Sequence, residues 1–150
     1  MELKPILEKI DFANRYRKIC DSHLEFDNRL SGNKNSVYKK VLDTFKYEYK
    51  FFSNGSFYQI KEAINERFIF QFHLVLKDGQ IEPLLYIKID NQNIDNMGRL
   101  DFIPQKLNIP FERKEFNLPL YSDEEELKEI LKSLFSIYED FKTEVLKSQL

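Results

Sequence analysis

The clearest pattern in the chain is a strict alternation of apolar side chains over residues 68–76. Every second position holds a large apolar residue: Phe68, Phe70, Phe72, Leu74 and Leu76. Side chains two residues apart share one face of a strand, so this pattern predicts a β-strand. The intervening Ile69 and Val75 are apolar as well. They predict a central strand with both faces at least partly covered.

Two tight turns are predicted beside this strand. Asn54-Gly55 and Asp78-Gly79 are dipeptides that tolerate the positive φ angles of a hairpin turn. Residues 45–51 alternate aromatic and charged side chains, which predicts a half-buried strand before the first turn. Residues 56–64 suit either a strand or a helix, and the preceding turn favours the strand. Residues 81–89 are predicted to return as a further strand, in which a proline near the start suits an edge or a bulge.

Helices are predicted at both ends of the chain. Apolar residues at steps of three and four predict an amphipathic helix over 3–20 and a short helix over about 37–45, with Asn35 or Ser36 as its cap. A third apolar stripe predicts a long helix from about 123 to about 147. Ser122 and Glu125 form an S-x-x-E capping box at its start, and an acidic first turn is favoured by the helix dipole.

Together these elements predict one α+β domain spanning residues 1–150. We expect an antiparallel sheet of four or more strands, with the N-terminal helices and the long C-terminal helix packed on one face. A chain of 150 residues with 42% hydrophobic residues is sufficient for one such core. Residues 90–121 contain no long element, so short strands or turns are expected there. The sequence leaves open whether this segment is a binding loop or packed structure.

Composition restricts the expected partners. The formal net charge is -2, whereas proteins that coat nucleic acids usually carry a basic excess, so no nucleic-acid partner is expected. Charges interrupt the N-terminal segment, which therefore lacks the continuous apolar region of a signal peptide. No apolar run is long enough to span a membrane. We therefore expect no membrane partner and a cytoplasmic location. The single cysteine allows no intramolecular disulfide. A homo-oligomer is compatible with all of these observations.

Residues 89–101, IDNQNIDNMGRLD, are crowded with oxygen ligands and raise the question of a calcium loop. The register that places the acidic and amide residues best puts Asn96 where an EF-hand needs glycine, and Phe102 at the position of its bidentate glutamate. A structural zinc site needs four ligands, and the chain has only one cysteine and two histidines. The sequence therefore predicts no metal and no cofactor.

Three further classes of protein are alternatives: a metal-dependent nuclease, a thiol enzyme and a nucleic-acid-binding protein. A metal-dependent nuclease would need a carboxylate two residues before Lys88, where Tyr86 stands. A thiol enzyme would use Cys20 with His23 or His73 as its base, but Cys20 lies on the apolar stripe of its helix. Aromatic side chains on the strands suit base stacking, but the Lys/Arg-Gly-Phe cluster of sheet-based RNA binders is missing. None of these classes is favoured.

The profile as a whole resembles the immunity proteins of bacterial toxin systems and, more distantly, secretion chaperones. The resemblance rests on size, charge and architecture over the whole chain. Secretion chaperones usually follow an α-β-β-β-α-β-β-α order, whereas here four predicted strands run together. The resemblance implies a non-enzymatic protein-binding module, most simply an immunity-type protein that neutralises a bacterial toxin by direct binding. A secretion or effector chaperone is the alternative.

The predicted partner-binding residues follow the last predicted strand. They combine charged and polar groups around an apolar anchor, as protein interfaces commonly do. The residues are Asp90, Asn93, Asp95, Asn96, Met97, Arg99, Asp101, Phe102, Arg113 and Lys114. The competing interpretation is that they are solvated loop residues with no partner.

Overall fold

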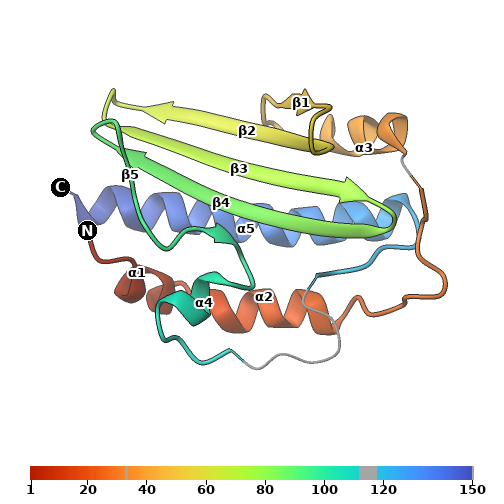
Figure 1. Ribbon diagram of the computed structural model, residues 1–150, viewed down its shortest axis with the longest axis horizontal. Helices are drawn as coiled ribbons and strands as arrows, with labels where there is room; N and C mark the ends of the chain where they lie inside the picture. The colour runs from red at the N-terminus through yellow and green to blue at the C-terminus, as the bar shows by residue number, and fades with distance from the viewer. Residues whose placement is uncertain (33, 112–117, 150) are drawn as a thin grey trace.

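A computed structural model of the chain describes residues 1–32, 34–111 and 118–149, in which six strands form one antiparallel sheet (Figure 1). The strands are β1 (Lys50–Phe52), β2 (Phe57–Ile64), β3 (Phe68–Lys77), β4 (Gln80–Ile89), β5 (Gln92–Asn93) and β6 (Gly98–Arg99). The first five lie in the order of the sequence, and β6 also pairs with β4. Consecutive strands joined by short turns make β1–β4 a simple meander.

The helices lie on one side of this sheet. They are α1 (Leu3–Lys9), α2 (Phe12–Asp21), α3 (Asn35–Leu42), α4 (Ile103–Lys106) and α5 (Glu124–Ser148). In Figure 1, α5 runs behind the strands along their length, and α1, α2 and α3 all pack against it. The predicted α+β fold, with an antiparallel sheet and terminal helices, is confirmed.

The core forms where β3 meets α5. The alternating Phe and Leu side chains of β3 are all buried, as the sequence predicts. Phe70 packs edge-to-face on Phe141, and Phe72 lies against both Phe135 and Tyr138. Large aromatic rings bury much apolar area, so these contacts supply a large part of the hydrophobic stabilisation.

The two faces of the sheet are buried to different extents. β3 lies between β2 and β4, and Ile69 and Val75 are partly buried, so the prediction of a central strand with both faces at least partly covered is confirmed. The described part of the chain places no helix over the face of Ile69 and Val75 (Figure 1). Among the described residues, the helical cover of the sheet is therefore one-sided.

Several element boundaries differ from those predicted. The helix over 3–20 is divided at Ile10–Asp11, where Asp11 adopts a left-handed φ of 56°. The predicted strand over 45–51 begins only at Lys50. Its earlier aromatic residues lie in an irregular segment, where Phe45 and Tyr47 pack on Phe135 of α5. Their alternation reflects burial against α5 and not pairing with a strand.

The turns follow the sequence in part. Asp78 and Gly79 have φ angles of 53° and 74° and close the β3–β4 hairpin as predicted. Before β2, the positive φ angles fall at Gly55 and Ser56, one residue later than Asn54-Gly55. The ambiguous segment after this turn is strand β2, as favoured.

The cap of α5 is also displaced by one residue. Asp123, and not Ser122, is the N-cap, and its carboxylate accepts the backbone N–H of Glu126 at 2.8 Å. The Glu126 carboxylate in turn accepts the backbone N–H of Ser122 at 2.8 Å. The expected cap of α3 is wrong as well, because Lys34 occupies the N-cap and no side chain caps the helix.

We predict that Phe72→Ala lowers the free energy of unfolding by about 3–5 kcal/mol, because it removes a fully buried ring from the contact between β3 and α5. The matched control is Val75→Ala, on the half-exposed face of the same strand, which should cost no more than about 1 kcal/mol. Urea denaturation of both variants measures the difference. Equal losses would contradict a one-sided core.

Candidate functional site

The predicted partner-binding loop returns along the β4 edge of the sheet. Its short strands pair with β4, Asn93 opposite Lys88 and Arg99 opposite Leu84. Helix α4 follows directly, so much of the segment 90–121 is packed structure within the described residues. The predicted residues Arg113 and Lys114 lie outside the described residues.

A buried ion pair holds this loop in place. Both nitrogens of one edge of the Arg99 guanidinium donate to the two carboxylate oxygens of Asp101, each at 3.0 Å. Asp101 is fully buried, whereas the Arg99 side chain is 27% exposed. Arg99 also lies 3.5 Å from Glu82 of β4 and 4.3 Å from the ring centroid of Phe102. Planar guanidinium groups suit such bidentate and stacked contacts.

Met97 and Asp90 have different roles at the two ends of the loop. Met97 is buried, and its carbonyl oxygen accepts a hydrogen bond from Nζ of Lys106 at 2.9 Å. Asp90 is exposed and bound by Arg67 through two hydrogen bonds of 3.0 and 3.1 Å, which lower its pKa. As they lie, neither Met97 nor Asp101 can contact a partner, so their observed role is to anchor the loop.

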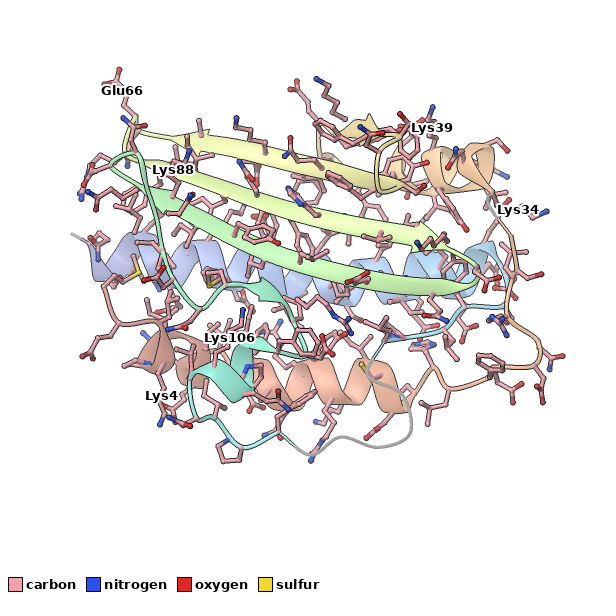
Figure 2. The ribbon with its side chains drawn as sticks, viewed as in Figure 1. Lys4, Lys34, Lys39, Glu66, Lys88 and Lys106 are labelled. Atoms are coloured by element: carbon pink, nitrogen blue, oxygen red, sulfur yellow. The ribbon has the colours of Figure 1, made fainter. Side chains whose placement is uncertain are left out.

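The remaining predicted residues are accessible. Asn93, Asp95 and Asn96 are exposed and line an open groove of about 620 Å³ between the loop, the start of α1 and the end of α4. Lys4 and Lys106 also line it, at the end of the molecule where Figure 2 labels them. The groove is lined by acidic, basic, amide and apolar side chains together. No single type of group predominates, so the lining does not indicate a class of substrate.

A second surface was not predicted as a site. On the uncovered side of the sheet, four rings from four neighbouring strands form a continuous aromatic row: Phe52, Phe57, His73 and Tyr86. Successive ring centroids are 5.0, 4.8 and 5.2 Å apart. The row crosses the sheet from β1 to β4 and lies among side chains that are half-buried or exposed.

Strand register defines the rest of this surface, which we call the open sheet face. Residues paired across an antiparallel sheet point to the same side. The open sheet face comprises Lys50, Phe52, Phe57, Gln59, Lys61, Ala63, Ile69, Gln71, His73, Val75, Lys77, Gln80, Glu82, Leu84, Tyr86 and Lys88. Its middle combines aromatic and apolar residues with Gln59 and Gln71, and lysines lie toward its margins.

His73 contributes packing and hydrogen bonding to this surface. Partial burial lowers its pKa, which favours the neutral ring near neutral pH. Its Nε2 lies 3.1 Å from Nε2 of Gln59. The sequence contained a signal for this surface, because Gln71 and His73 interrupt an otherwise apolar strand. These two polar residues indicate that one face of the strand is partly polar. They do not indicate whether a helix packs on that face.

The thiol-enzyme alternative does not fit the geometry. Cys20 is buried on the helical side, and burial raises the pKa of its thiol to about 12. The nearby His23 is bound through Nδ1 to the carboxylate of Glu126 at 2.7 Å, and His73 lies on the opposite side of the sheet. A protonated, enclosed thiol without a free base is a poor nucleophile.

In the part of the chain that the structure describes, no group of three or more His, Cys, Asp or Glu side chains is placed to hold a metal ion. No helix among the described residues combines the length and the apolar character that crossing a bilayer requires. In comparisons with known proteins, no family model, curated protein or solved structure matches the chain. The loop and the open sheet face are therefore the two candidate sites.

We predict that Asp101→Ala lowers the free energy of unfolding by about 2–4 kcal/mol, because it leaves the partly buried Arg99 without its bidentate partner. Asp95→Ala, in the same loop but exposed, should change stability by no more than about 0.5 kcal/mol. Thermal and urea unfolding of the two variants would settle the matter. If the Asp101 variant is as stable as the Asp95 variant, the ion pair does not anchor the loop.

We also predict that Cys20 resists thiol reagents in the folded chain. With a pKa of about 12, roughly one molecule in 10⁴ carries the thiolate at about pH 8, and burial blocks access as well. Ellman's reagent should label the folded chain very slowly and the urea-unfolded chain completely. Rapid stoichiometric labelling of the folded chain would show that the thiol is reactive.

Proposed function

We propose that the protein is a non-enzymatic protein-binding module of the immunity type, which neutralises a bacterial toxin in the cytoplasm by covering part of its surface. The observation that supports this proposal is the aromatic row on the open sheet face. Partly exposed aromatic residues gathered on one surface are typical of protein interfaces, where such rings supply much of the binding energy.

The exposed loop residues extend this surface. Asn93 stands opposite Lys88 of the open sheet face, and Arg99 stands opposite Leu84. The proposed interface therefore runs from the aromatic row across β4 and onto Asn93, Asp95 and Asn96, while Asp101 holds the loop from beneath. A partner lying on the sheet would meet this polar rim at the β4 edge.

A surface of this kind acts by covering a partner, because it offers contact area without a reacting group. An inhibitor of a toxin needs no chemistry of its own. It needs a complementary surface and a slow rate of dissociation, and most affinity differences between related complexes lie in that rate. The rigid sheet supplies the surface, because its side chains are already held by cross-strand contacts before a partner arrives.

We expect the product of the neighbouring open reading frame to inhibit growth when expressed alone. Coexpression with this protein should restore growth, and the two chains should copurify in a fixed ratio. A neighbour that is harmless alone, or that forms no complex, contradicts the proposed function.

The loop is tested in the same complex with Asn93→Glu combined with Asn96→Asp, which adds two negative charges beside Lys88. Both side chains are exposed, so the variant should keep its thermal midpoint while it binds more weakly. The matched control is Lys132→Glu, which makes the same change of charge at an exposed position on α5. If both variants bind like the unaltered chain, the loop lies outside the interface.

A further inference from the structure

We infer that the open sheet face docks an acidic protein surface, with the aromatic row as the apolar centre of the contact and the surrounding lysines as its charged rim. This inference rests on the proposed function and specifies the chemistry of its partner. It follows from the charge of the face, from the orientation of its rings and from the behaviour expected of a second copy of the chain.

The open sheet face is basic although the chain as a whole has a net charge of -2. Four of its residues are lysines, and its only carboxylate is Glu82, which lies 3.5 Å from Arg99. Within the described residues, Lys50, Lys61, Lys77 and Lys88 form no ion pair. Among the described residues no carboxylate pairs with these lysines, and their positive charge favours an acidic partner.

The lysines are distributed around the aromatic row of the face. Lys50 and Lys61 lie toward the β1 and β2 side, and Lys77 ends β3. Lys88 lies near the end of β4, where Figure 2 labels it. Lys77 pairs with Gln80 at the start of β4, so the two lysines lie at opposite ends of the β3–β4 pair. An apolar centre with a polar, charged rim is the usual arrangement of a protein interface, in which the rim excludes water and directs association.

The ring orientation favours a protein over a nucleic acid. Phe57 is stacked between Phe52, at an interplanar angle of 12°, and His73, at 26°. Phe57 is thus already stacked with a ring on each of the two adjacent strands. A nucleobase binds by stacking on a free ring face, and such neighbours leave less of that face for it. Protein side chains pack against aromatic rings in several geometries, including contacts with the ring edge.

A second copy of this chain is a poor occupant of the same face. Two open sheet faces laid together would bring four lysines against four lysines, and like charges facing each other across an interface disfavour association. The acidic partner removes this repulsion and replaces it with attraction. The partner that we infer for the open sheet face is therefore an acidic surface on a different protein.

The first arm of the test uses chemical probes and the isolated full-length chain. A ¹⁵N-labelled sample is titrated with a glutamate-rich peptide containing leucine anchors, and separately with an oligothymidylate of the same net charge. We expect the peptide to shift the amide signals of Gln71, His73 and Tyr86 and to leave those of α5 unchanged. The combined variant Lys61→Glu with Lys88→Glu should weaken peptide binding about tenfold or more.

The matched control is Lys128→Glu with Lys132→Glu, two exposed lysines of α5 that also form no ion pair with described residues. It should change peptide affinity by less than about twofold. Equal weakening by the two double variants, or shifts spread over α5, would overturn the inference. Tighter binding of the oligothymidylate than of the peptide would overturn it in favour of a nucleic-acid surface.

The second arm separates this inference from the proposed function. If the neighbouring gene product binds and the Lys61→Glu, Lys88→Glu variant binds it as tightly as the unaltered chain, the inference is wrong and the proposed function stands. If that product does not bind but the peptide maps to the open sheet face, the inference stands and the toxin assignment falls. Weakened binding in both arms supports both.

Discussion

The structure depends on the burial of one face of β3 against a single long helix. A sheet strand presents two faces, and here the regular Phe and Leu side chains of residues 68–76 point only toward α5. The stripe of α5 is matched to them, with Phe135, Tyr138 and Phe141 in ring contact with β3. Helices α1 to α3 are then positioned by their own contacts with α5. Over the other face of the sheet, residues 1–32, 34–111 and 118–149 place no comparable helix.

A polar network fastens the β2 side of this contact. Lys142 of α5 is buried, and its Nζ lies 2.6 Å from Glu62 of β2 and 2.7 Å from Glu139. The hydroxyl of Tyr138 donates to the same Glu62 carboxylate at 2.6 Å. Buried charged groups are costly unless they are fully paired, so this network specifies how α5 lies on the sheet more than it adds net stability.

Much of the fold could be predicted from the sequence because it is encoded locally. The alternation in β3, the turn at Asp78-Gly79 and the apolar stripe of α5 each follow from neighbours within a few residues. The helix break at Asp11 could not be predicted, because it depends on how α1 and α2 each reach the core. The prediction of a strand over 45–51 fails at Phe45 and Tyr47 for a related reason. Their alternation arises from burial against Phe135, which is distant in sequence.

The candidate site was less accessible to sequence reasoning. The polar composition of the loop correctly predicts that Asn93 and Asp95 are exposed. Met97 and Asp101 lie in the same polar stretch and are nevertheless buried, which composition does not reveal. The aromatic row was hidden because its members come from four strands and meet only through register. No local pattern states which face of a sheet will be left without a helix. That depends on how much helix the whole chain provides.

Hydroxyl-radical footprinting tests this one-sided arrangement most directly. The rings of Phe57 and Tyr86 should be oxidised readily in the free chain and protected when a protein partner is bound, whereas Phe72 and Phe141 should be protected in both states. Strong protection of Phe57 and Tyr86 in the free monomer would contradict an open sheet face. Unchanged oxidation of these rings in a saturated complex would contradict its role as the binding surface.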